Sequence, residues 1–365
     1  MIISRTPFRI SFFGGGTDYP AWYRAHGGQV LGTAINKYCW ITCRYLPPFF
    51  EHRFRVVYSK IEDRSSVDEI AHPAVREVLR YLKVEHGVEI HHDGDLPARS
   101  GIGSSSSFAV GLLHAIHALH GEMCSKTELA SEAIHIEQER LREAVGSQDQ
   151  VFAAHGGFNH VQFLQNGEMT VTPITVAPER LHDLNSHLML FFTGISRTAS
   201  AVAKTYTEDL QAKDRQLRRM HAMVDEAIDL VRGADDPALV GELLNEGWQL
   251  KRSLDPSIAT HQVDELYAAA RAAGALGGKL LGAGGGGFVL LLARPGDQPR
   301  IRAALSRLIH VPFRFDYSGS RIVFFDHEED FSEQSRLREL NEIEPFRDAD
   351  QPGGGQSAAG GRKRG

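Results

Sequence analysis

The sequence predicts an α+β protein with two domains, on three observations. A chain of 365 residues exceeds the size at which one hydrophobic core keeps growing, so two domains are expected. The second half reads as strand, helices, strand, helix and strand, an order that packs helices on one face of a largely antiparallel sheet. In the first half, a Gly/Ser-rich segment at 96–107 runs directly into an amphipathic helix. We expect domains at residues 1–183 and 184–345, followed by a disordered tail at 346–365.

The composition is that of a soluble globular protein without nucleic-acid or membrane partners. Hydrophobic residues make up 42% and charged residues 24%, and the net charge of −6 offers nothing to a nucleic acid. No apolar run reaches membrane-spanning length and the first residues lack a signal-peptide layout, so we expect a cytoplasmic protein. Cys39, Cys43 and Cys124 have no metal-ligand spacing and indicate reduced thiols. The Gly-rich tail has almost no apolar residues, so it should be dispensable after about Arg347.

Strand-like and helical patterns organise the first 94 residues around a glycine turn. Strands are expected at 9–13, 30–45, 54–58 and 88–92, and a helix at 72–84. Three glycines after the first strand, followed by Thr17 and Asp18, predict a tight turn that places a carboxylate at the strand end. A plain turn with an Asx hydrogen bond is the alternative. His91 and His92 are adjacent in a strand, so they face opposite sides and cannot chelate one metal together.

The segment at 96–107, named the phosphate loop, favours phosphate binding. The helix after it has an apolar face and a stop at Gly121; the face consists of Phe108, Leu112, Ile116 and Leu119. A helix N-terminus presents free N–H groups and the positive end of the helix dipole, and glycines let the backbone approach a phosphate closely. The segment is not a Walker A motif, because no lysine follows its second glycine. A Ser-capped helix after a turn is the alternative.

The next helix, at about 125–142, carries a candidate metal ligand. Ser125 and Glu128 form a capping-box signature at its start. Glu137 lies in the middle of its apolar face, whereas Glu139 points the opposite way; the face consists of Ala130, Ala133, Ile134 and Leu141. A carboxylate on a buried face is costly unless it meets a cation, although a less buried helix or a salt bridge would also explain it. The break at 146–150 then presents Asp149 at a turn.

The second domain begins with a strand at 187–192. Helices are expected at 201–231, 237–254 and 262–273, and a glycine loop at 277–287 enters a strand at 288–293. A helix at 300–308 follows, and strands at 314–317 and 321–326 are expected to close this second unit.

These ordered motifs resemble those of the GHMP kinases, over residues 1 to about 345. The family's P-x-x-S-G-L-G-S-S-[SA] loop is matched by Pro97 to Ser106, with Ile102 in place of Leu. Its C-terminal glycine motif is matched by Lys279 to Gly287, and the aspartate segment after the helix by Gly146 to Gln150. The N-terminal strand and turn match those of galactokinase-like members; the matching residues are Pro7, Arg9, Gly14, Thr17, Asp18 and Tyr19. Four motifs in the right order are far more specific than any one of them.

The resemblance implies a fold, two cofactors and a set of roles. The N-terminal domain should resemble ribosomal protein S5 domain 2 and the C-terminal domain a ferredoxin-like fold, with ATP and Mg²⁺ in the cleft between them. Asp149 would accept the proton of the attacking hydroxyl, and Arg9 would hold Asp149 ionised. The implied nucleotide-binding residues are Pro97, Ser100, Gly101, Ile102, Gly103, Ser104, Ser105 and Ser106. Those implied to bind the sugar are Gly15, Gly16, Thr17, Asp18, Gly284 and Gly285, with Gly284–Gly287 also bracing the phosphate loop. Ser105 and Glu137 would hold the metal.

The acceptor implied is a sugar phosphate. The segments at 9–20, 136–158, 277–288 and 315–323 are similar to those of family members that phosphorylate the anomeric hydroxyl of D-glycero-D-manno-heptose 7-phosphate, a step toward nucleotide-activated heptose and cell-surface polysaccharide. Gly15 and Gly16 stand where galactokinases carry Glu and His, which argues against galactose and leaves room for a longer substrate. The distal phosphate needs a cationic partner, for which the candidates are Arg24, Lys37, Arg44 and Arg99. The alternatives are a kinase for a fucose-like sugar or a mevalonate-type alcohol, and a non-catalytic sugar- and ATP-binding sensor.

Overall fold

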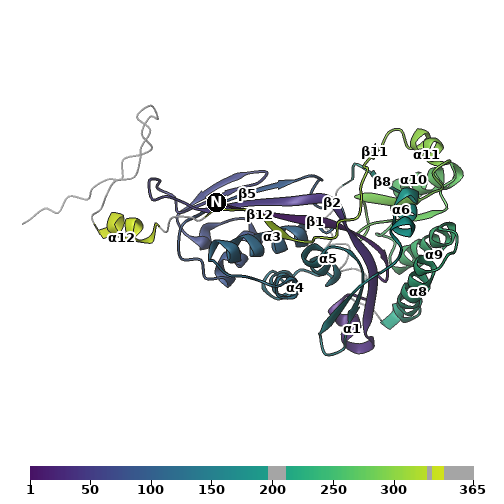
Figure 1. Ribbon diagram of the computed structural model, residues 1–365, viewed down its shortest axis with the longest axis horizontal. Helices are drawn as coiled ribbons and strands as arrows, with labels where there is room; N and C mark the ends of the chain where they lie inside the picture. The colour runs from purple at the N-terminus through teal and green to yellow at the C-terminus, as the bar shows by residue number, and fades with distance from the viewer. Residues whose placement is uncertain (196–210, 327–330, 341–365) are drawn as a thin grey trace, which may run out of the picture.

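Two β-sheets carry the fold (Figure 1). The computed structural model describes residues 1–195, 211–326 and 331–340. The expected tail at 346–365 and the first part of the expected helix at 201–231 lie outside these ranges. None of the helices in these ranges is both long and apolar enough to cross a membrane.

The first sheet is built around two long antiparallel strands, β1 (Ile2–Phe13) and β2 (Gly28–Tyr45). Its order is β12-β1-β2-β5-β3-β4, and β6 pairs with the first residues of β2 and with β7. The remaining strands are β3 (Phe54–Val57), β4 (Ile61–Arg64), β5 (Val88–Gly94), β6 (Phe158–Phe163), β7 (Met169–Pro173) and β12 (Arg321–Phe325). The strands expected in the first 94 residues are confirmed, and β1 and β2 are longer than their apolar patterns indicate.

Helices α3, α4 and α5 lie along one face of this sheet (Figure 1). They span Ser104–Leu119, Lys126–His135 and Gln148–His155. The capping box of α4 is confirmed, because Ser125 Oγ accepts from the Glu128 N–H and Glu128 accepts from the Ser125 N–H. After α4 the chain continues as a π-helical turn, η2 (Ile136–Arg140). The other helical segments are α1 (Pro20–His26), η1 (Val67–Glu69) and α2 (Pro73–Tyr81).

The second sheet has the strand order β11-β8-β10-β9, and every neighbouring pair is antiparallel. Its strands are β8 (Leu188–Phe192), β9 (Gly277–Leu280), β10 (Phe288–Leu292) and β11 (Ile309–His310). The helices around it are α6 (Pro178–His187), η3 (Gln211–Lys213), α8 (Asp214–Arg232), α9 (Ala238–Leu254), α10 (His261–Ala272) and α11 (Gln298–Ala304). This is the strand order of a ferredoxin-like domain, so the predicted α+β class is confirmed.

The prediction that residues 314–317 and 321–326 close the second sheet is wrong. After β11 the chain returns to the first sheet, where Phe315 bridges to Ile35 of β2 and β12 pairs with β1. The reason is that β1 would otherwise have an unpaired edge, and a strand pattern says nothing about which edge its strand will join. The division at residues 183 and 184 otherwise stays a prediction. A last helix, α12 (Ser332–Leu340), was not expected; its Arg338 donates to the carbonyls of Pro48 and Phe50.

Candidate active site

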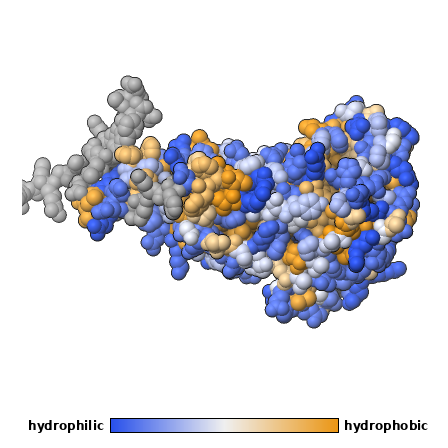
Figure 2. Space-filling model, viewed as in Figure 1, coloured by the Kyte–Doolittle hydropathy of each residue, from blue (hydrophilic) through white to orange (hydrophobic). Residues whose placement is uncertain are grey.

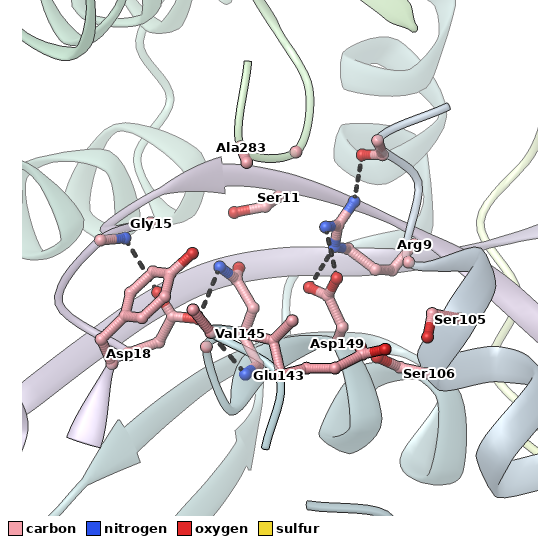
Figure 3. Close-up of a pocket in the computed structure, with 18 of the residues that line it drawn as sticks. Arg9, Ser11, Gly15, Asp18, Ser105, Ser106, Glu143, Val145, Asp149 and Ala283 are labelled. Atoms are coloured by element: carbon pink, nitrogen blue, oxygen red, sulfur yellow. Dashed lines mark hydrogen bonds and ion pairs between the residues drawn. The ribbon is translucent and has the colours of Figure 1, made fainter. Parts of the chain in front are cut away.

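One cavity, of about 230 Å³, forms where the two sheets meet (Figure 3). It lies between β1, the 99–106 loop, the 143–149 segment, the end of α9 and the 282–283 loop. From the first strand and turn, the predicted site residues on its wall are Arg9, Gly15, Gly16 and Asp18. From later segments they are Gly101, Gly103, Ser104, Ser105, Ser106, Glu137 and Asp149. Segments far apart in the sequence therefore converge on one place.

Helix α3 points an uncapped N-terminus into this cavity. Its N-cap residue is Gly103, in the left-handed conformation with φ 74°, and no side chain caps the first turn. The alternative of a Ser-capped helix is therefore excluded. Ser104 Oγ instead accepts from the Arg99 N–H at 3.1 Å, outside the helix. The N–H groups of the first turn remain available to an anion, as predicted for a phosphate site.

Arg9 and Asp149 form a bidentate ion pair on the cavity wall (Figure 3). Arg9 Nε and Nη2 each donate to an Asp149 oxygen at 2.7 Å, while Nη1 donates to the Gly101 carbonyl at 2.7 Å. The Arg9 side chain is buried and that of Asp149 is 24% exposed. This planar fork fixes the carboxylate within the cavity beside the phosphate loop.

The Glu137 carboxylate is fully buried and faces two serines of the phosphate loop. It accepts from Ser105 Oγ at 2.5 Å, from Ser106 Oγ at 2.6 Å and from Gln150 Nε2 at 2.5 Å. Burial raises the pKa of Glu137 to about 7, against the opposing effect of these hydrogen bonds. Glu139 is exposed, which confirms the predicted helix phase.

This pair of oxygens fits a magnesium ion. Mg²⁺ binds hard oxygen ligands at about 2.1 Å in an octahedron, so neighbouring ligands stand about 2.9 Å apart. In the structure a hydrogen bond of 2.5 Å joins Ser105 Oγ to Glu137 Oε1, so the two oxygens already face each other beside the start of α3. The three side chains that donate to Glu137 are neutral, and among the described residues no Lys or Arg forms an ion pair with it.

Asp18 lies on the cavity wall, but neighbouring residues cover its carboxylate. Its residue is 0% exposed, and its carboxylate accepts from the Gly16 N–H at 2.8 Å and from Gln148 Nε2 at 2.9 Å. Burial raises the pKa of Asp18, and the negative charge of Asp149 adds to the shift.

Other predicted residues support the site from behind the cavity wall. Thr17 Oγ1 donates to the carbonyls of Gly14 and Gln29, while Gly284 and Gly285 pack against Ile258. In the phosphate loop, Ser100 Oγ donates to the Pro97 carbonyl, and the Ile102 carbonyl accepts from the Arg9 N–H. The structure does not bring these six residues to the cavity wall; they are Thr17, Gly284, Gly285, Pro97, Ser100 and Ile102.

The two glycine loops pack backbone against backbone. Phe288 N–H donates to the Ser100 carbonyl at 3.1 Å, and a Cβ on Gly287 would collide with that carbonyl oxygen. A Cβ on Gly101 would lie 2.5 Å from the Leu281 carbonyl oxygen. The later loop therefore braces the phosphate loop, through Gly287 rather than through Gly284.

The cavity wall also carries polar residues to which the sequence analysis gave no role, among them Ser11, Gln148, Lys251 and Lys279. Strand alternation from Arg9 would have indicated Ser11. Lys251 donates to the carbonyls of Leu280 and Gly282, and burial, reinforced by Arg9, lowers its pKa to about 8. Lys279 donates to the Phe12 carbonyl, and burial lowers its pKa well below the usual lysine value. Nothing in the pattern of α9 distinguishes Lys251 from a surface lysine.

Of the four cations proposed for a distal phosphate, only Arg99 reaches the cavity wall. Arg44 is paired with Glu89, at 2.7 Å from Nε to the carboxylate. Arg24 and Lys37 lie in α1 and β2, outside the cavity lining. Besides Arg9, the basic residues on the cavity wall are therefore Arg99, Lys251 and Lys279.

Comparison with known proteins gives matches in both halves of the chain. The family descriptions "GHMP kinases N terminal domain" and "GHMP kinases C terminal" match residues 69–157 and 227–310. The chain is 27% identical over 319 residues to a D-glycero-alpha-D-manno-heptose 7-phosphate kinase of Campylobacter jejuni, covering 84% of this chain and 93% of that protein. It is 30% identical over 259 residues to the mevalonate kinase of Pyrococcus abyssi, covering 68% and 72%. The crystal structure of a D-glycero-D-manno-heptose 1-phosphate kinase from Bacteroides thetaiotaomicron has a TM-score of 0.67 at 24% identity, covering 90% and 100%, which shows the fold.

Proposed function

This chain belongs to the GHMP kinases. We propose that it transfers the terminal phosphoryl group of ATP to the anomeric hydroxyl of D-glycero-D-manno-heptose 7-phosphate, giving the 1,7-bisphosphate. A relative that covers 84% of this chain and 93% of its own length is named as a heptose 7-phosphate kinase. The observation that supports the chemistry is the Arg9–Asp149 pair beside the uncapped start of α3.

The proposed roles follow from what phosphoryl transfer needs, which is positioning, charge neutralisation and an oriented hydroxyl. The N–H groups at the start of α3 bind the triphosphate. Asp149 accepts or orients the proton of the attacking hydroxyl, and Arg9 holds Asp149 in place through two hydrogen bonds.

Ser105 and Glu137 are the proposed magnesium ligands. When bound, the ion neutralises charge on the phosphate oxygens. The chain's own contribution is to hold the two oxygens 2.5 Å apart at the start of α3, with Ser106 and Gln150 fixing the carboxylate.

The acceptor is tested by comparing kcat/KM in an ADP-release assay for heptose 7-phosphate, unphosphorylated heptose, galactose, fucose and mevalonate. We expect heptose 7-phosphate to give the highest value, and phosphorus NMR of the product to show a new phosphate on the anomeric carbon. Mevalonate is included because a mevalonate kinase is 30% identical to this chain. A higher kcat/KM for galactose, fucose or mevalonate would leave only the broader kinase assignment.

Arg99 and Lys251 are the proposed partners of the distal phosphate. Exchange of the true partner for glutamate should raise KM for the phosphorylated sugar and leave KM for ATP and for unphosphorylated heptose nearly unchanged. Arg44→Glu is the control, because Arg44 lies outside the cavity wall. An equal rise in KM for ATP would place the altered cation at the nucleotide.

A further inference from the structure

Two buried polar atoms on the cavity wall have no hydrogen-bond partner: Ser11 Oγ and Gln148 Oε1. The residues are 5% and 8% exposed. A buried polar atom without a partner is destabilising, because it has lost its hydrogen bonds to water and gained none in return. Because both residues line the cavity, a bound ligand can supply the missing partners.

The chemistry of the missing partner is set by the neighbours of Gln148. Its Nε2 donates to the Asp18 carboxylate at 2.9 Å, which leaves Oε1 as the free atom. An amide oxygen only accepts, so its partner must be a donor. Ser11 Oγ both donates and accepts. Hydroxyl groups satisfy both atoms, whereas a carboxylate or phosphate oxygen does not satisfy Gln148.

Gly15 keeps the space between these side chains open. A Cβ on Gly15 would stand 3.5 Å from Ser11 Oγ and 3.5 Å from Gln148 Nε2, so both side chains lie next to the Gly15 backbone. Gly16 differs, because its φ of 108° requires glycine and a Cβ there would approach Leu217 of α8.

Asp18 does not compete for the same hydroxyls. Gly146 lies so close that a Cβ on it would collide with the Asp18 carboxylate, and the donors to that carboxylate are the Gly16 N–H, the Gln148 N–H and Gln148 Nε2. Asp18 therefore acts through Gln148, whose amide it orients.

We propose that Ser11 and Gln148 select the acceptor by binding hydroxyl groups other than the one that is phosphorylated, with Asp18 as a positioning residue. The inference rests on the proposed sugar kinase function. It predicts a polyhydroxylated acceptor, because such a molecule offers a separate hydroxyl group to each of the two atoms.

The first test compares two buried serines of β1. Ser11→Ala should raise KM for heptose 7-phosphate about three- to tenfold and leave KM for ATP unchanged. It should not lower Tm, because the hydroxyl that it removes has no partner. Ser4→Ala should do the reverse, lowering Tm and sparing both KM values, because Ser4 Oγ donates to the Gly111 carbonyl at 2.8 Å, away from the cavity.

The second test removes hydroxyls from the acceptor instead. With the wild-type protein, one monodeoxy analogue of the sugar phosphate should have a lower kcat/KM than the parent sugar phosphate. With Ser11→Ala, the same analogue and the parent sugar phosphate should have the same kcat/KM. A different analogue should show the same non-additivity with Gln148→Met. Asp18→Asn should raise KM for the sugar less than Gln148→Met does, because asparagine can still bond the amide and orient it.

The outcomes separate the two proposals. If the wild-type protein phosphorylates the heptose phosphate but Ser11→Ala and Ser4→Ala give the same KM for it, this inference is overturned and the proposed function stands. If another sugar is the better acceptor, the heptose assignment fails, and the same pair of variants decides this inference with that sugar. Preference for mevalonate overturns both.

Discussion

Among single residues, Asp149 is the one on which turnover should depend most. Asp149→Asn should lower kcat by about two to four orders of magnitude, because a carboxamide cannot take a proton, and leave KM for ATP nearly unchanged. Glu143→Gln, at another carboxylate of the cavity wall, is the matched control and should lose far less. Steady-state kinetics with varied ATP measure both. Near wild-type turnover in Asp149→Asn would remove Asp149 from the role of base.

The magnesium ligand is tested on the two glutamates that flank Gln138. Glu137→Gln should raise the Mg²⁺ concentration needed for half-maximal activity at least about tenfold, because a neutral amide binds a divalent cation weakly. Glu139→Gln should have little effect, since Glu139 is exposed. A Mg²⁺ titration of activity separates them. Greater damage from Glu139→Gln would contradict the assignment.

A buried histidine should make the fold sensitive to mild acid. Burial lowers the pKa of His114 to about 4, and the ring shares a 2.9 Å hydrogen bond with Ser320 Oγ. The unfolded chain, with a histidine pKa of about 6.5, takes up the proton first as pH falls. The free energy of unfolding should therefore decrease by about 2 kcal/mol from pH 7 to pH 5 on account of this residue.

Urea denaturation at these two pH values measures the effect. His114→Gln keeps a side chain that can bond Ser320 and cannot titrate, so it should show a smaller loss between pH 7 and pH 5 than the wild-type protein. Identical losses would mean that the pKa of His114 is the same in the folded and the unfolded chain.

Sequence reasoning predicted the position of some residues from local periodicity and of others from motifs. The phase of one helix placed Glu137 rather than Glu139 on the buried side, and two motifs indicated Arg9 and Asp149, which line the cavity. It failed for Lys251, whose position on the cavity wall depends on how α9 packs against β9. It also failed to separate Asp18, which is covered, from Gln148, which presents a free oxygen.

At the level of secondary-structure elements, the packing of the two glycine loops should determine nucleotide binding. Gly101→Ala forces a Cβ to 2.5 Å from the Leu281 carbonyl oxygen in addition to a φ of 80°, so the loops must separate. It should destabilise the protein by at least about 3 kcal/mol and raise KM for ATP. Urea denaturation and ATP kinetics measure these two effects.

Gly121→Ala is the control for backbone strain alone. Its φ of 74° is similar, but no atom lies within 4 Å of its Cβ position. This variant should lose only about 1–2 kcal/mol and keep its KM for ATP. Equal destabilisation by the two substitutions would show that the contact between the loops contributes nothing.

The sequence predicted the start of an element correctly where a local capping motif marks it, as Ser125 and Glu128 do for α4. The π-helical turn at Ile136–Arg140 was not expected, because a single wide turn leaves no periodic signal. The partner of β12 could not be predicted either, since β12 pairs with a strand more than 300 residues away.

For the stability of the whole molecule, β12 should be required and the residues after Arg347 should not. A chain ending at Arg347 should keep its Tm and activity, because the residues removed are almost free of apolar side chains. A chain ending at Gly319 should lose at least about 5 °C in Tm, since it exposes the edge of β1 and removes Ser320, which bonds Thr6 and His114. Differential scanning calorimetry compares them. A drop of several degrees in the longer chain would show that the tail contributes to the fold.

The surface near this edge carries apolar side chains. Val323, Phe324 and Phe325 of β12 are 44%, 43% and 52% exposed, and Figure 2 shows hydrophobic side chains gathered on the part of the face where Figure 1 places β12. Charged and polar residues cover much of the rest of this view.

The pairing of β12 with β1 also has a consequence during synthesis on the ribosome. Ile2 pairs with Phe325, so β1 leaves the ribosomal tunnel long before the strand that covers its edge. At about 5–20 residues per second, that delay is roughly 15–60 s. During this time the open edge of β1 can pair with other nascent chains on the same messenger. A chaperone that binds this segment should therefore raise the yield of soluble protein more when it acts during translation than when it is added afterwards.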